Sequence, residues 1–102
     1  MNKINLRGVT RFEWDESNIE HVAKHYVIPK EAEEVFFDEN NVSGEDFKHS
    51  KSEERFLIIG KTKKGRLLYQ IFTIRGDKIR VISSRDINKK EVGLYEKETN
   101  GS

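Results

Sequence analysis

The residues of this chain best suited to hold an anion are four basic side chains in one segment near the C-terminus. They are Arg75, Lys78, Arg80 and Arg85. Two apolar, β-branched runs flank Gly76-Asp77, a pair typical of a two-residue hairpin turn. Arg80 then falls in mid-strand, where a guanidinium needs an anionic partner and can bind two phosphate oxygens at once. We predict that Arg80 binds a phosphate group, with Arg85 as second candidate; the alternative for each is a salt bridge to Glu13, Glu53 or Glu54.

The turn also predicts the register of the whole hairpin. One face pairs Arg75 with Lys78, Thr73 with Arg80, Ile71 with Ile82, and Tyr69 with Ser84. The other face pairs Ile74 with Ile79, Phe72 with Val81, Gln70 with Ser83, and Leu68 with Arg85. The second face is mostly apolar and requires a cover, most simply by helices. The first face carries the basic and aromatic side chains, and we predict that it is a binding face.

Charge is unevenly distributed along a chain whose net charge is only +1. Residues 1–60 hold 8 Lys and Arg against 13 Asp and Glu, whereas residues 61–90 hold 10 against 2. This asymmetry is typical of a protein that meets a polyanion or an acidic protein on one surface. The alternative is a solvated basic face that an acidic helix elsewhere in the fold balances.

His25 is the residue best able to exchange a proton near neutral pH, and Lys24 beside it can help to bind an anion. The alternative is that both residues cap the negative end of a helix. His21 and His25 have the spacing with which a helix offers two ligands to zinc, and His49 is a possible third ligand. We rank this metal site below an exposed histidine pair, because the chain has no cysteine and lacks the glutamate of a zinc-protease helix. We therefore expect no metal and no other cofactor.

The hydrophobic pattern predicts an α+β fold in one domain over residues 1–102, with flexible tails at 1–9 and 98–102. The predicted elements are a short strand at 12–14, a helix from an Asp15 cap to about His25, a helix from Pro29 to about Phe37, strands at 56–60, 67–75 and 78–85, and a helix after an Asn88/Glu91 capping box. Residues 38–52 are predicted to be a loop with a short edge strand around Val42. With neither an export signal nor a membrane span, a cytoplasmic location is expected.

Several motifs together resemble the BrnT family of bacterial toxins, over roughly Phe12 to Glu96. They are Phe12-Glu13-Trp14-Asp15, Asn18, Lys24-His25, Glu31-Ala32 with Val35-Phe36, Glu53-Glu54-Arg55-Phe56 with Gly60, Gly65-Arg66-Leu67-Leu68, Thr73-Ile74-Arg75-Gly76-Asp77 and Ile79-Arg80-Val81-Ile82-Ser83-Ser84-Arg85. The chain departs from the family at Tyr26, where glycine is usual, and at Ile28, where a Ser or Thr cap is usual.

The resemblance implies a single RelE-like domain with a short first strand, two helices, a three-stranded antiparallel sheet and a C-terminal helix. It also implies the toxin of a type II toxin-antitoxin system, a ribonuclease that stops translation. Its partner would be a ribbon-helix-helix antitoxin, in a 2:2 complex that contacts operator DNA only through the antitoxin.

Metal-free RNA cleavage needs a base, an acid and cations for the phosphate. The candidates for catalysis are Arg80, Lys24, His25 and Arg85, and those for RNA contact are Tyr69, Thr73, Arg75, Lys78 and Tyr95. The alternative function is a non-catalytic module whose basic hairpin holds nucleic acid or an acidic protein.

Overall fold

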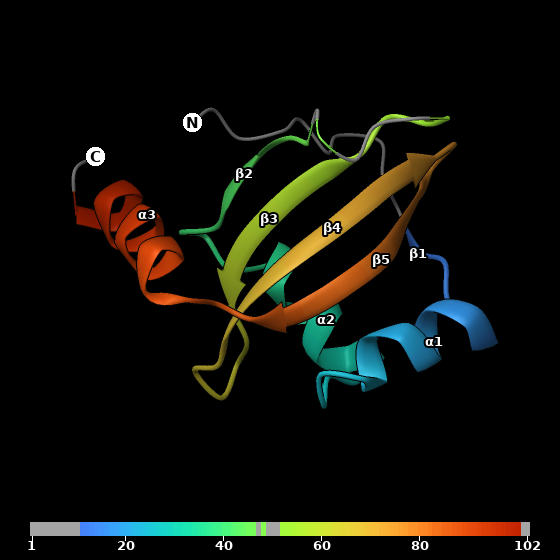
Figure 1. Ribbon diagram of the computed structural model, residues 1–102, viewed down its shortest axis with the longest axis horizontal. Coiled ribbons are helices and arrows are strands. Elements are labelled where there is room, and N and C mark those ends of the chain that lie inside the picture. The colour runs from blue at the N-terminus through green and yellow to red at the C-terminus, as the bar shows by residue number, and fades with distance from the viewer. Residues whose placement is uncertain (1–10, 47, 49–51, 101–102) are drawn as a thin grey trace.

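The fold is α+β, as predicted from the sequence, with three helices and one mixed sheet (Figure 1). The structure, a computed structural model, describes residues 11–46, 48 and 52–100. In chain order the elements are β1 (Arg11–Phe12), α1 (Glu16–Ala23), α2 (Pro29–Phe36), β2 (Val42–Glu45), β3 (Phe56–Lys61), β4 (Leu67–Arg75), β5 (Lys78–Asp86) and α3 (Lys89–Asn100). No helix within these ranges has the length and apolar character that a membrane crossing needs.

The sheet has five strands in the order β1-β5-β4-β3-β2, whereas three antiparallel strands were predicted. The short first strand pairs in parallel with β5, and β2 pairs antiparallel with β3. Both lie at the edges of the sheet, and each was predicted as a short strand, at 12–14 and around Val42, but not as part of the three-stranded sheet. β3 is flanked on both sides, which agrees with its unbroken apolar run.

The hairpin register is as predicted beside the turn but wrong further along. Gly76 has a φ of 62°, and the pairs from Arg75/Lys78 to Phe72/Val81 are those expected. A β-bulge follows: Ile71 pairs with Ser83, so Ile82 is an extra residue on β5. Each later pair shifts by one. The observed pairs are Gln70/Ser84, Tyr69/Arg85 and Leu68/Asp86. Arg85 therefore shares the face of Tyr69 and not, as predicted, that of Leu68.

Helices α1 and α2 cover one face of the sheet and form the main core with it. Val22, Val27 and Val35 pack there with Phe72 and Val81 from the sheet. Close packing of α2 on β3 requires Gly60, because a Cβ there would lie 2.8 Å from both the Cγ1 and the carbonyl oxygen of Val35.

The first turn of α1 is fixed by the buried side chain of Asn18. Its Nδ2 donates to the carbonyl oxygens of Glu13 at 3.0 Å and Val81 at 3.1 Å. Asp15 caps the helix as predicted, since its Oδ1 accepts from the Asn18 amide at 3.2 Å. These bonds tie α1 to β5 next to the bulge.

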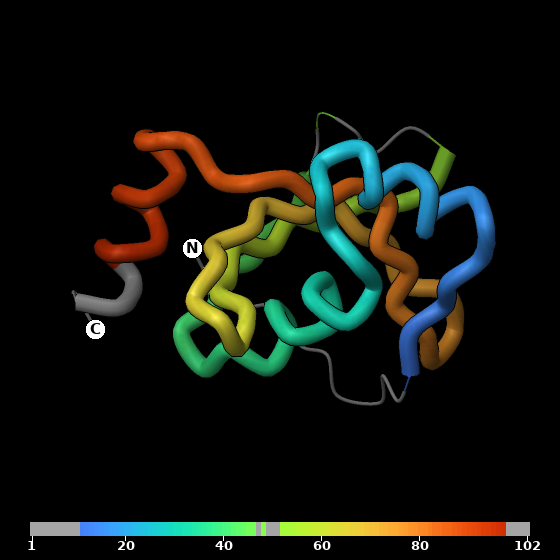
Figure 2. The backbone as a smooth tube through the Cα atoms, turned by 90° about the horizontal axis from the view of Figure 1, so that it is seen from below, coloured from blue at the N-terminus to red at the C-terminus, as the bar shows by residue number. Residues whose placement is uncertain are grey.

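Helix α3 lies against the other face, at the opposite end of the molecule from α1 (Figure 2). Its capping box is as predicted, because the Glu91 amide donates to Asn88 Oδ1 at 2.9 Å and Asn88 donates to Glu91 Oε1 at 3.0 Å. Tyr95 packs with Val42 and Ile59. The helix continues to Asn100, into the stretch 98–102 predicted as a tail. Residues 1–9, 101 and 102 of the predicted tails lie outside the described residues.

Candidate functional site

A pocket of about 550 Å³ lies between α1 and the sheet, on the part of the α3-bearing face of β4 and β5 that α3 does not cover. Five of its lining side chains are basic or can become so. They are His21, His25, Lys48, Arg55 and Arg85. Asp46 is the one acid among the lining residues, and Ile71 and Ile82 supply apolar surface. A concave, cationic pocket with titratable side chains is a suitable place for chemistry on an anion.

The β-bulge brings Arg85 into this pocket. Its guanidinium carbon lies 4.3 Å from the centre of the Tyr69 ring, in a cation–π contact. Two nitrogens of the same group donate to the Glu91 carboxylate, at 2.8 and 2.7 Å. This pairing lowers the pKa of Glu91, so the carboxylate is a poor base near neutral pH. Burial is the main cause that raises the pKa of Tyr69, which therefore stays protonated.

His21 and His25 are one turn apart and both line the pocket. Behind them α1 ends in a turn: the amide of Tyr26 donates to the Ala23 carbonyl at 3.0 Å, and the amide of Val27 to the Val22 carbonyl at 3.2 Å. Helix α1 ends at Ala23, two residues earlier than predicted, so His25 belongs to this turn.

Arg66 fixes the position of this turn through hydrogen bonds. It donates to the carbonyl oxygens of His25 at 2.9 Å and Tyr26 at 2.8 Å, and to Asp86 Oδ1 at 2.8 Å. The arginine thus connects the end of α1 to the end of β5, with the pocket between them. The sequence analysis placed Arg66 in a motif but assigned it no role.

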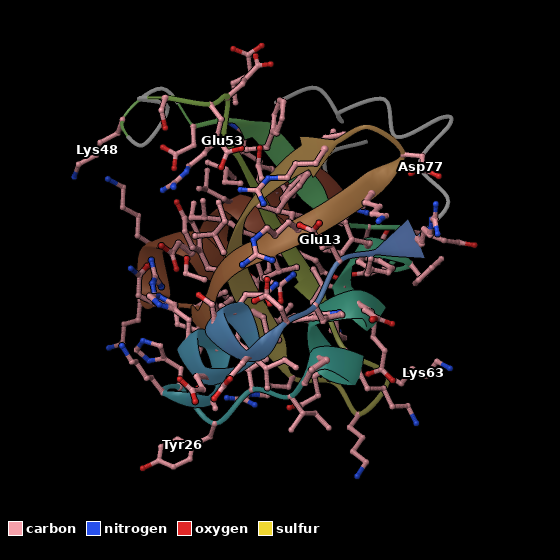
Figure 3. The ribbon with its side chains drawn as sticks, turned by 90° about the vertical axis from the view of Figure 1, so that its right-hand side faces the viewer. Glu13, Tyr26, Lys48, Glu53, Lys63 and Asp77 are labelled. Carbon is pink, nitrogen blue, oxygen red and sulfur yellow. The ribbon has the colours of Figure 1, made fainter. Side chains whose placement is uncertain are left out.

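Arg80 lies in a separate ionic cluster. Its guanidinium donates to Asp15 at 2.9 and 3.1 Å and to Glu13 at 3.4 Å, and its side chain is 12% exposed. Arg75 bonds to the same Glu13 at 3.3 Å and to Glu53 at 3.2 Å. In Figure 3, Glu13 lies over β5. The hydrogen bond with Arg80 is the main cause that lowers the pKa of Asp15. The salt bridge that the sequence left open as the alternative is therefore formed, and the phosphate role of Arg80 stays a prediction.

Of the nine residues predicted to act on RNA, the pocket brings together His25, Arg85 and Tyr69. Lys24 lines a neighbouring hollow on α1, with Glu16, Glu20 and His21.

The other predicted RNA contacts lie elsewhere. Thr73 is buried and donates to the Glu54 carbonyl at 2.8 Å. Lys78 lies beside the hairpin turn, opposite Arg75. Tyr95 is 6% exposed and donates to Asp38 Oδ2 at 2.7 Å, which joins α3 to the loop after α2.

The sequence analysis missed six polar pocket residues: His21, as a proton carrier, Asp46, Lys48, Arg55, Ser83 and Ser84. The spacing of His21 and His25 was visible but was considered only for zinc. Within the described ranges, no three His, Asp or Glu side chains are grouped so as to hold a metal ion. His49, the third ligand considered from the sequence, lies outside the described residues.

Residues 14–91, more than half of the chain, match the family model described as ribonuclease toxin, BrnT, of type II toxin-antitoxin system. No curated protein is significantly similar to the chain.

Proposed function

Because this chain belongs to the BrnT family of type II toxin-antitoxin ribonuclease toxins, we propose that its basic pocket cleaves RNA without a metal ion. The observation that carries the proposal is the meeting of two histidines with Arg55 and Arg85 in one pocket. Metal-free cleavage needs a base, an acid and fixed cations, and these side chains supply all three.

In the proposed reaction one imidazole removes the proton from a ribose 2′-OH. The 2′-oxygen then forms a bond to phosphorus, the bond from phosphorus to the 5′-oxygen breaks, and the second imidazole gives its proton to that leaving oxygen. The products are a 2′,3′-cyclic phosphate and a 5′-hydroxyl. We assign the two proton transfers to His25 and His21 as a pair.

The phosphate would lie against Arg85 and Arg55, where charge builds up in the transition state. Arg85 is held on two sides, by Glu91 and the Tyr69 ring, so its position is fixed before substrate arrives. Arg80 takes second place for this role, because it lies in a separate ionic cluster and is not among the residues that line the pocket. Lys24 lines the neighbouring hollow on α1 together with His21 and would attract the RNA backbone.

A short single-stranded RNA tests the reaction. The protein should cleave it equally well with and without EDTA, and the new ends should be a cyclic phosphate and a 5′-hydroxyl. A matched RNA with 2′-deoxyribose at the cleaved nucleotide should stay intact. His25→Ala and His21→Ala should each lower the rate by about 10²- to 10⁴-fold. EDTA-sensitive cleavage would refute the metal-free mechanism. Tight binding without any cleavage would favour the non-catalytic module.

The family implies an antitoxin partner, and we propose that an acidic segment of this partner covers the same pocket. The support is the charge of the pocket: five of its lining side chains are basic or can become so, against one acid, Asp46, so an acidic inhibitor gains most by occupying it. We further propose that the antitoxin carries a ribbon-helix-helix domain, whose dimerisation yields a 2:2 complex that contacts operator DNA through the antitoxin.

Co-expression with the neighbouring gene, followed by light scattering, measures this stoichiometry. The complex should lack ribonuclease activity, and separating the toxin from its partner should restore it. A toxin that stays monomeric and active beside excess partner would refute the proposal.

A further inference from the structure

Tyr26 has a backbone conformation that its side chain does not favour. Its φ is 60°, the one positive φ of a non-glycine residue within the described part of the chain. This left-handed region is strained for L-residues other than glycine, asparagine and aspartate. The side chain is 88% exposed, so packing does not compensate for the strain. Strain of this kind, where the surroundings enforce it, is characteristic of functional sites.

The turn that carries Tyr26 is held firmly. Arg66 donates to the Tyr26 carbonyl at 2.8 Å, and the following residue, Val27, is 1% exposed in the core. The ring nevertheless points away from the body of the protein (Figure 3). A fixed backbone with an outward-facing ring presents a flat aromatic surface at little further cost in backbone entropy.

Tyr26 directly follows His25, which lines the basic pocket, although Tyr26 is not itself among the lining residues. Proteins bind single-stranded RNA by combining a positively charged groove for the backbone with aromatic rings on which bases stack. The basic pocket supplies the first feature and Tyr26 the second.

We propose that Tyr26 stacks on the base of a nucleotide adjacent to the cleaved phosphate and thereby selects RNA in which that base is unpaired. This inference rests on the proposed function, since it assumes that RNA binds in the basic pocket. It adds a residue that determines substrate choice and that takes no part in proton transfer.

The test uses Tyr26→Gly, which removes both the ring and the strain, and Tyr26→Phe, which keeps the ring. Tyr26→Gly should lower kcat/KM on single-stranded RNA by about 5- to 150-fold, while its Tm equals or exceeds that of the wild type. Tyr26→Phe should retain wild-type kcat/KM. The control is Phe37→Ala, another exposed aromatic, which lines a hollow at the other end of α2; it should not change kcat/KM.

RNA substrates with one abasic nucleotide, placed in turn on each side of the cleavage point, identify the stacked base. At one of these positions the wild type should fall to the rate of Tyr26→Gly, and the two proteins should then be equal. A Tyr26→Gly protein that cleaves every substrate as the wild type does would overturn the proposal. So would a loss that persists on every abasic substrate, or a variant that loses only its neutralisation by the antitoxin, which would make Tyr26 a protein contact.

Binding to an uncleavable 2′-deoxy oligonucleotide, measured by fluorescence anisotropy, separates this inference from the proposed function. Weaker binding by Tyr26→Gly alone would support stacking even if the wild type cleaved no RNA. Equal binding together with normal cleavage by the wild type would refute the stacking role and leave the proposed function intact.

Discussion

Replacing Arg85 with alanine should lower kcat for RNA cleavage by about 10²- to 10³-fold, equivalent to ~2.7–4 kcal/mol, the usual loss when one fixed donor to a developing negative charge is removed. The effect on stability should be far smaller. The Arg85 side chain is 38% exposed, and partly solvated ion pairs contribute about 0–1 kcal/mol. For a domain of this size that corresponds to a decrease in Tm of at most about 8 °C.

Glu91→Gln is the matched control, because it removes the charge opposite Arg85 and keeps an oxygen that can accept from the Asn88 amide, now at 3.0 Å. Without a competing carboxylate, Arg85 should bind phosphate better. KM should therefore fall by roughly 5-fold, which corresponds to about 1 kcal/mol of binding free energy. The assay is initial-rate cleavage of a short RNA, with a thermal melt on each variant. Equal loss of activity in folded Arg85→Ala and Glu91→Gln would refute the reasoning, because activity would then depend on the ion pair and not on the guanidinium.

Three further predictions test the structure around the site. Arg80→Ala should lower Tm, because Asp15 loses its partner at the start of α1, and should leave RNA cleavage measurable; lost cleavage at unchanged Tm would restore the phosphate role of Arg80. Gly60→Ala should lower the free energy of unfolding by about 1–3 kcal/mol in urea titration, because the new Cβ would meet the Val35 side chain and carbonyl at 2.8 Å; no change would show that α2 shifts freely. The ion pairs lower the pKa of Asp15 and Glu91 in the folded protein. Their contribution to stability is therefore present above the unfolded-state pKa values near 4 and is lost as pH falls through the folded-state pKa values. Tm should fall on acidification below about pH 5, and a Tm that does not change with pH would contradict these pairs.

Local chemistry made part of this fold predictable. The Asp15 cap, the Asn88/Glu91 capping box and the Gly76-Asp77 turn each depend on a few neighbouring residues, and all three are found where the sequence placed them. The two edge strands were predicted as short strands, but their places in the sheet were not. A strand of two residues such as β1 gains its stability only by pairing with β5, which is distant in the sequence.

The partners of the arginines were not predictable for the same reason. A mid-strand guanidinium requires an anion, but sequence does not say whether protein or substrate provides it. For Arg80 the chain itself provides Asp15, from a loop that the fold brings to the hairpin. Arg85 pairs with a carboxylate from α3 and also lines the pocket, and under the proposed function phosphate would displace this carboxylate.

The β-bulge at Ile82 shows how one inserted residue creates the site. In the uninterrupted register Arg85 would face Leu68, which is fully buried beneath the helices, and a charge there would be costly to desolvate. The bulge puts Ser84 on that face instead, where its hydroxyl donates to Gln70 Oε1 at 2.7 Å while the Gln70 amide donates to the Ala32 carbonyl at 3.0 Å. Gln70 did not reveal the bulge in the sequence, because a buried amide requires polar partners and the uninterrupted register also offers it a serine, Ser83. Satisfying Gln70 in the core and exposing Arg85 in the pocket are thus consequences of the same backbone irregularity.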